Sequence, residues 1–231
     1  MEKQQIIEAS KILFDHKLNK TGLDNLNHLE PKNLDDAYKI QDELKIHYLS
    51  LKNNICIGRK IGCTSKAAQT QMNVTEPFYG NLFSKYSSKN VEKLNSKYFF
   101  EPFAEPEISF RIKDDIDISK APYSMDNIKN LLDGILCSIE IVDFRFNKPL
   151  ADIGAINLVS TNGASDYWIY NDKIYNIDEI GTLLLPVPST FVRRLRVVPQ
   201  TSAGLGGRKE SRACMTLQVP PGLTIQDAMS A

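Results

Sequence analysis

The hydrophobic pattern at the start of the chain predicts two amphipathic helices. Apolar residues recur three or four positions apart over about residues 5–14 and again over 34–49, which places them along one face of each helix. The segment between them, GLDNLNHLEPKN, is polar and contains Pro31, as expected of a loop. We therefore expect two helices before the first strand.

Past Asn54 the apolar residues come in short runs or alternate with polar ones, which is typical of strands. ICIGRKIGC predicts a strand, Ser65 is placed to cap the short helix KAAQTQM, and NVTEPFYGNLF predicts a loop that leads into a strand. The alternation in FFEPFAEPEISFRI and LCSIEIVDFRF predicts two more strands, separated by a helix at about 125–134. In INLVSTNGASDYWIYNDKIY, Asn162 and Gly163 mark a turn and YWIY a strand. The fold class is therefore α+β.

Composition places the chain among ordinary globular proteins. Its 231 residues are 42% hydrophobic and 24% charged, enough for one domain or two small ones. The chain has 28 basic and 28 acidic residues, so it lacks the basic footprint of a nucleic-acid or anionic-membrane binder. It has neither a membrane-spanning apolar run nor a signal sequence. We expect a cytoplasmic protein with a small-molecule partner and four structural cysteine thiols.

The composition changes near residue 180. Every asparagine lies in 1–180, whereas 181–231 contain a single lysine, several arginines and a high density of Pro and Gly. This density disfavours long helices and central strands. We therefore expect 1–180 to form the main domain, incomplete at its C-terminus. The segment 181–231 is expected to be an atypical, poorly ordered tail that a frameshift or a fusion would explain.

Three glutamates are the sharpest chemical feature. Glu105 and Glu107 are two positions apart on a predicted strand, so both carboxylates project from the same face. Like charges this close call for a cation, and a divalent ion with oxygen ligands is the economical one. Glu140, among apolar neighbours on the next strand, is the natural third ligand. The alternative is that Glu105 and Glu107 lie on the solvent face of an edge strand.

Three other charged residues accompany these strands. Lys60 lies between Ile and Gly neighbours, where it is either partly buried with an anion as partner or exposed at an edge. Asp143 and Arg145, two positions apart, are expected to form a structural pair near the site rather than act in chemistry.

Five strings carry a family resemblance: DDAYKIQ, GRKIGCTSKAAQTQMNVTEPFYGNLF, FAEPEISF, SIEIVDFR and TNGASDYWI. In this order and spacing, over roughly residues 5–175, the chain resembles the 2-keto-4-pentenoate hydratase group of the fumarylacetoacetate hydrolase superfamily. The resemblance implies two N-terminal helices, a strongly bent mixed sheet with a metal in its mouth, and assembly into a homo-oligomer. It also implies addition of water to a 2-hydroxypenta-2,4-dienoate in aromatic meta-cleavage catabolism, giving a 4-hydroxy-2-oxo acid.

The resemblance also assigns roles to residues. Glu105, Glu107 and Glu140 would hold Mg²⁺ or Mn²⁺, and Lys60 would hold the substrate carboxylate or move a proton. Relatives often carry an acidic residue where this chain has Phe78, which leaves Glu76 as the substitute for acid–base work. The expected substrate contacts are Lys60, Phe78, Asn162 and Ser165.

Two alternatives stay open. A sister activity, 4-oxalocrotonate (2-oxo-3-hexenedioate) decarboxylase, uses the same metal cradle, and such a decarboxylase is also a candidate partner subunit. The second alternative follows from residues 181–231, which do not resemble the C-terminal part of the family fold. On this hypothesis that part of the fold is replaced, and the chain is an inactive relative or a non-catalytic partner.

Overall fold

The computed structural model describes residues 1–91, 93–176 and 214–218. Most of the expected tail, 181–231, therefore lies outside the described residues, and its predicted disorder and origin stay predictions. The short segment Cys214–Gln218 is the exception, because it forms a strand of the sheet. Within the described residues, no helix has the length and apolar character needed to cross a membrane.

The two N-terminal helices are confirmed as α1 (Lys3–Asn19) and α2 (Leu34–Ser50). Asn33 caps α2, since its side chain accepts a hydrogen bond from the Asp36 amide. Ser65 caps the short helix α3 (Lys66–Gln71) in the same way, as the sequence predicts. The remaining helices are η1 (Asn27–Leu29), η2 (Ser84–Tyr86), η3 (Ser96–Tyr98), η4 (Ile118–Lys120), α4 (Met125–Lys129) and α5 (Leu150–Ser160).

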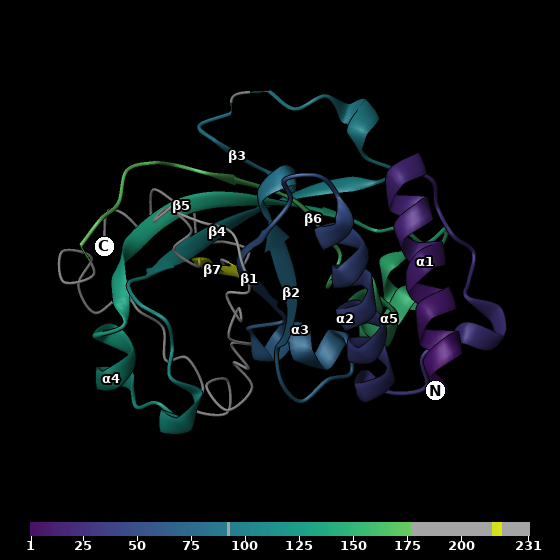
Figure 1. Ribbon diagram of the computed structural model, residues 1–231, viewed down its shortest axis with the longest axis horizontal. Helices are drawn as coiled ribbons and strands as arrows, with labels where there is room; N and C mark the ends of the chain where they lie inside the picture. Colours follow the sequence, from purple (N-terminus) through teal and green to yellow (C-terminus); the bar gives the residue numbers. More distant parts are fainter. Residues whose placement is uncertain (92, 177–213, 219–231) are drawn as a thin grey trace.

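One mixed sheet in the order β2-β1-β7-β4-β5-β6-β3 forms the centre of the molecule. Two of its pairs are parallel, β1 with β7 and β3 with β6. The long strands β4 and β5 bend strongly along their length (Figure 1). The strands are β1 (Cys56–Gly62), β2 (Phe78–Phe83), β3 (Ser87–Lys89), β4 (Pro102–Ile112), β5 (Leu132–Asp143), β6 (Ser165–Tyr170) and β7 (Cys214–Gln218).

Two predictions about helices need correction. The helix expected at about 125–134 ends at Lys129, and β5 already begins at Leu132. Gly134, with a φ of 153°, lies in that strand and is incompatible with a helix. Helix α5 has no counterpart in the sequence pattern, because LADIGAINLVS is mostly apolar and its backbone leaves the helical conformation at Gly154, so that it lacks a continuous amphipathic period.

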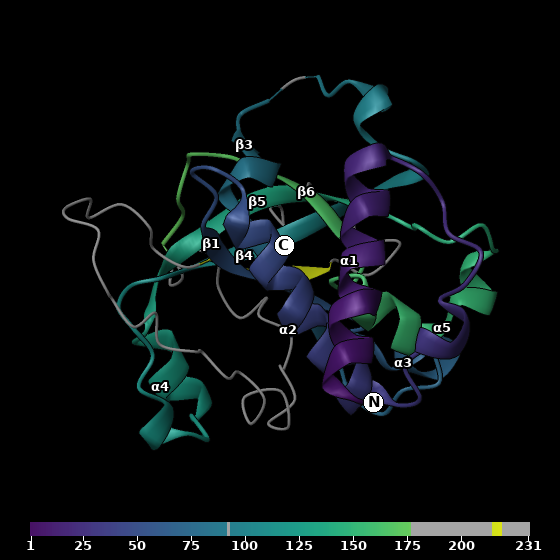
Figure 2. The ribbon, with the colours of Figure 1, turned by 45° about the vertical axis from the view of Figure 1, so that its right-hand side comes forward.

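The main core lies between the helices and the sheet. Helices α1, α2 and α5 gather at one end of the sheet, and α4 lies at the other (Figures 1 and 2). The buried residues of α1, α2 and α5 pack with Phe78 and Phe83 of β2 and with Val142 of β5. A smaller cluster joins Leu82 of β2 to Trp168 of β6 through Leu136 of β5, which shows how far the sheet curls.

We predict that Ile40→Ala lowers the free energy of unfolding by about 2–5 kcal/mol, because it leaves a cavity in this core. Ile40 on α2 is fully buried. Ile46 on the same helix is 57% exposed, so Ile46→Ala is the matched control and should change stability by less than about 0.5 kcal/mol. Urea denaturation of both variants measures the difference. Equal losses would contradict the described packing of α2.

Candidate metal centre

The structure brings the three predicted glutamates together on one face of two adjacent strands. Glu105 of β4 is paired in register with Glu140 of β5, and Glu107 follows on the same face. Their carboxylate oxygens, one from each residue, lie within 4.8 Å of one another. Glu107 and Glu140 are each 1% exposed, and β4 lies between β7 and β5. The alternative of a solvent face on an edge strand is therefore wrong.

Lys60 of β1 supplies the positive charge of this cluster. It is buried, and its Nζ lies 3.5 Å from Oε2 of Glu140. Burial by itself lowers the pKa of Lys60, but the charges of Glu140, Glu105 and Glu107 outweigh it and raise this pKa above its ordinary value. The ammonium form is therefore the stable one, and the expectation of an exposed edge lysine is excluded.

The cluster of Lys60, Glu105, Glu107 and Glu140 is not balanced in charge. Three carboxylates against one ammonium leave two negative charges when all the groups are ionised. The pKa of Glu105 is raised, mainly by burial and partly by Glu140, although Lys60 lowers it. Oε1 of Glu140 is buried and accepts no hydrogen bond from a described residue. A divalent cation would supply the missing charge and ligate this oxygen, so these residues fit the predicted metal.

Two serines extend the polar face that carries the glutamates. Ser109 of β4 and Ser138 of β5 are both buried, and their Oγ atoms lie 2.6 Å apart. Ser138 is paired in register with Glu107. The hydroxyl pair therefore lies directly beside the glutamate cluster and joins its two strands.

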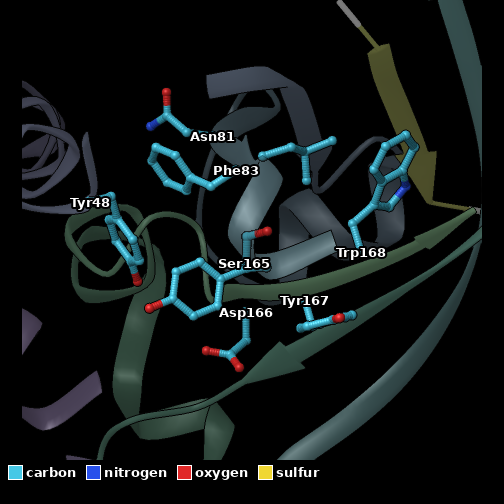
Figure 3. Close-up of a pocket in the computed structure, with 9 residues that line it drawn as sticks. Tyr48, Asn81, Phe83, Ser165, Asp166, Tyr167 and Trp168 are labelled. Carbon is cyan, nitrogen blue, oxygen red and sulfur yellow. The ribbon is translucent and has the colours of Figure 1, made fainter. Parts of the chain in front are cut away.

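The other predicted site residues lie at different distances from the cluster. Phe78 begins β2, is buried, and places its ring centroid 5.9 Å from Nζ of Lys60. Glu76 is half-buried in the loop between α3 and β2. Ser165 begins β6 and lines a cavity between β2 and β6, together with Tyr48 and Trp168 (Figure 3). That cavity has a volume of about 10 Å³, enough for one water molecule and too small for an organic acid.

Asn162 is predicted to contact substrate, but its side chain is fully engaged within the protein. Its Oδ1 accepts hydrogen bonds from the backbone N and the Nδ2 of Asn81, at 2.7 and 2.9 Å, and its Nδ2 donates to the Asn81 carbonyl. Gln41 of α2 joins the same network by accepting from Nδ2 of Asn81. Asn162 therefore ties the turn before β6 to β2, and a substrate contact by it stays a prediction.

The turn that contains Asn162 also packs against the stem of Lys60. Gly163 has a φ of 65°, and a Cβ built on it would lie 2.9 Å from Cε of Lys60. A side chain here would be strained and would displace the lysine. The Asn-Gly pair that marks a turn in the sequence therefore also shapes the space around the ammonium group.

The expected pair of Asp143 and Arg145 is confirmed, with Nη2 of Arg145 at 2.6 Å from Oδ2 of Asp143. The sequence analysis missed the two residues that complete this network, Lys17 of α1 and Asp166 of β6. Lys17 had a detectable signal, because it follows Leu13 and Phe14 at helical spacing on the apolar face of α1. Nothing in the local sequence links it to Asp166.

Comparison with known proteins finds relatives of this chain. No family model matches the chain. A 2-keto-4-pentenoate hydratase of Paraburkholderia xenovorans (strain LB400) is 30% identical over 172 residues, which are 73% of this chain and 61% of the relative. The chain is a homologue of the 2-keto-4-pentenoate hydratases. A 4-oxalocrotonate decarboxylase of Pseudomonas sp. (strain CF600) is 27% identical over 157 residues, 66% of this chain and 56% of that protein.

The fold of this chain is shared with a solved structure. A 4-oxalocrotonate decarboxylase from Pseudomonas putida G7, complexed with magnesium and adipate, superposes with a TM-score of 0.71 at 22% identity, covering 78% of this chain and 66% of that one. These matches confirm the resemblance found in the sequence. This hydratase homologue spans about three fifths of the length of the curated relatives it matches.

We predict that Asn162→Ala lowers the free energy of unfolding by about 1–3 kcal/mol, because two donors of Asn81 lose their buried acceptor. Asn171→Ala, in the exposed turn after β6, is the control and should change stability by less than about 0.5 kcal/mol. Thermal and urea unfolding followed by circular dichroism measure both variants. An unchanged stability of Asn162→Ala would show that the network with Asn81 is not formed.

Proposed function

We propose that the chain is a metal-dependent hydratase. It adds water to a 2-hydroxypenta-2,4-dienoate-type substrate and gives a 4-hydroxy-2-oxo acid. The observation that carries the proposal is the buried cluster of Glu105, Glu107 and Glu140 beside Lys60, on a chain homologous to hydratases. The chain covers only part of those relatives, so the reaction is inferred from the site and from the homology together.

Mg²⁺ or Mn²⁺ is the proposed cofactor, held by the carboxylates of Glu105, Glu107 and Glu140. Three oxygen ligands leave about half of an octahedral shell for the oxygens of a small acid and for water. The bound ion would act as a Lewis acid on the 2-oxo group of the substrate. The neighbour of known structure is complexed with magnesium, which supports this choice of metal.

Lys60 is proposed to hold the substrate carboxylate and to donate a proton at Nζ. Its raised pKa keeps the ammonium charged near neutral pH, and its burial keeps competing water away. The ring of Phe78 covers one side of the ammonium group, and the turn at Gly163 fixes its stem. Glu76, half-buried in the loop before β2, is the proposed second acid–base group. Asn162 and Ser165 are the remaining proposed substrate contacts.

We predict that the purified chain binds Mn²⁺ and that Glu107→Gln weakens this binding and abolishes turnover, because it removes one anionic ligand from a buried site. Isothermal titration measures the binding. Glu30→Gln changes an exposed glutamate and is the control that should behave as wild type. A folded chain that binds no divalent ion would contradict the metal role.

Turnover is measured as a Mg²⁺- or Mn²⁺-dependent loss of the ultraviolet absorbance of the dienol substrate. Loss of absorbance without CO₂ release supports the hydratase. Release of CO₂ from 2-oxo-3-hexenedioate would instead support the decarboxylase alternative, for which the 27% identity to a 4-oxalocrotonate decarboxylase speaks. Metal binding with neither reaction would support an inactive relative that serves as a partner subunit. Light scattering would report the homo-oligomer that we also infer.

The boundary near residue 180 enters the proposal as well. We infer that 1–180 form a catalytic domain that is incomplete at its C-terminus and that 181–231 are an atypical tail. Strand β7 from that segment pairs with both β1 and β4, so its loss would leave two unpaired edges inside the sheet. We predict that the fragment 1–180 aggregates, whereas the full chain stays monodisperse in size-exclusion chromatography. A stable fragment that still binds Mn²⁺ would contradict the pairing of β7.

A further inference from the structure

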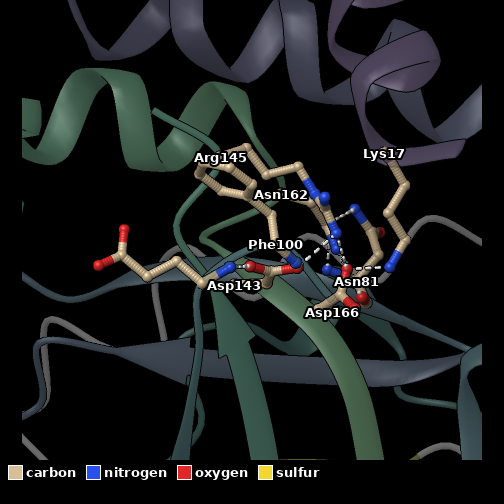
Figure 4. A network of polar contacts seen from close by, with 8 residues as sticks. Lys17, Asn81, Phe100, Asp143, Arg145, Asn162 and Asp166 are labelled. Carbon is tan, nitrogen blue, oxygen red and sulfur yellow. Dashed lines mark hydrogen bonds and ion pairs between the residues drawn. The ribbon is translucent and has the colours of Figure 1, made fainter. Parts of the chain in front are cut away.

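A second cluster of buried charges links helix α1 to the start of strand β4 (Figure 4). Lys17 of α1 is ion-paired with Asp166 of β6. Oδ1 of Asp166 also accepts a hydrogen bond from Nη2 of Arg145 at 2.8 Å, and the same Nη2 donates to Oδ2 of Asp143 at 2.6 Å. All four side chains are at most 7% exposed. The four charges therefore alternate in sign along one buried chain of contacts.

Asp143 is where this chain of contacts reaches the backbone. Its Oδ2 accepts a hydrogen bond from the amide of Phe100 at 2.9 Å, and its Oδ1 accepts one from the amide of Glu101 at 2.7 Å. Strand β4 begins at the next residue, Pro102, which is paired in register with Asp143 itself. One carboxylate thus holds the two amides at the entry to β4.

The two hydrogen bonds that Asp143 accepts from the amides of Phe100 and Glu101 form a clamp, and its position matters for the glutamates. Glu105 follows the clamped amide of Glu101 by four residues, and Glu107 by six. Because the strand period is two, a slip of one residue in the pairing would turn both carboxylates to the opposite face of the sheet. Among the described residues, the entry of β4 pairs with β5, and the described pairing with β7 begins at Glu107. The partners of the entry in the described residues are therefore β5 and the clamp.

The charges behind the clamp are buried and paired with one another. Burial, and then the nearby Arg145, lower the pKa of Lys17. Removing one member of a buried, paired set leaves its partners without compensation. Arg145 is also fixed through its backbone, because its carbonyl accepts a hydrogen bond from the amide of Leu23 at 2.7 Å. Arg145 and Asp166 together hold Asp143 in one position.

We propose that Asp143 is a positioning residue for the glutamate cluster. By holding the amides of Phe100 and Glu101, it sets the register in which Glu105 and Glu107 meet Glu140, and Arg145, Asp166 and Lys17 fix its own place. The inference rests on the proposed function, because it concerns the affinity of that cluster for a divalent ion. Asp143 itself does not touch metal or substrate.

The test is the affinity for Mn²⁺ in Asp143→Asn, measured from the electron paramagnetic resonance signal of the free ion. The amide oxygen of asparagine can accept one of the two backbone N–H groups, but its NH₂ group would face the other. We expect the dissociation constant to rise at least about tenfold, as for other groups that orient metal ligands. The measurement is made at a temperature at which circular dichroism shows the variant folded.

Asp36→Asn is the matched control. Asp36 is also a buried carboxylate with a charged partner and a backbone donor, the N-terminal ammonium at 2.9 Å and the amide of Lys32. It lies on α2, and its hydrogen bonds are to Met1, Lys32 and Asn33 rather than to the entry of β4. We expect it to lower the melting temperature and leave the Mn²⁺ dissociation constant within about twofold of wild type, since a structural loss far from the ligands is not transmitted to them.

If Asp143→Asn does not fold, Arg145→Lys takes its place. It keeps the buried positive charge but lacks the length and the planar guanidinium that place Nη2 of Arg145 between the two carboxylates, so the Mn²⁺ affinity should fall in the same direction. Wild-type affinity in the folded variant, or an equal loss in Asp36→Asn, overturns the inference while the proposed function stands. A wild-type chain that binds no Mn²⁺ overturns the proposed function and the inference with it.

Discussion

The site depends on one constraint, which is that three carboxylates that repel one another are held on one buried face. Glu107 and Glu140 are almost fully buried and Glu105 is partly buried, and the ammonium group of Lys60 lies against Glu140. Burying an uncompensated charge is costly, and the cost grows when like charges share a site. The surrounding groups are arranged to hold these charges together. The turn at Gly163 packs against the aliphatic part of the Lys60 side chain. The bend of the sheet brings β1 close to β5, although the two strands are not neighbours in the strand order.

Holding such a cluster requires a fixed register between β4 and β5. Two interactions hold this register, one on each side of the glutamates. Asp143 clamps the backbone before β4, and the hydroxyls of Ser109 and Ser138 meet across the two strands beyond the glutamates. The pairing is continuous between these points and shifts only further on, between Arg111 and Ile112. The register shift therefore lies outside the part of the two strands that positions the glutamates.

Much of this site could be predicted from local sequence. Glu105 and Glu107 share a face because a strand has a period of two, and Glu140 is conspicuous as a charge among apolar neighbours. The pairing of Glu105 with Glu140 could not be predicted, because it depends on the register of two strands 35 positions apart. The contact of Lys17 with Asp166, 149 positions away, lies further beyond any local pattern. Helix α5 was not predicted for another reason, since its mostly apolar segment is interrupted at Gly154 and carries no continuous period that distinguishes a helix from a strand.

The contrast between the two buried charge clusters argues for which of them takes a ligand. Lys17, Arg145, Asp143 and Asp166 contribute equal numbers of positive and negative charges, and two backbone amides complete the partners of Asp143. The charges of this network are paired with one another, as expected of a structural device, although Nη1 of Arg145 is buried without a hydrogen-bond acceptor among the described residues. The glutamate cluster has an excess of negative charge among the described residues, and its Glu140 has a buried oxygen with no hydrogen-bond donor there. A hard divalent cation would remove both deficits at once, which is why the metal belongs with the glutamates and the positioning role with Asp143.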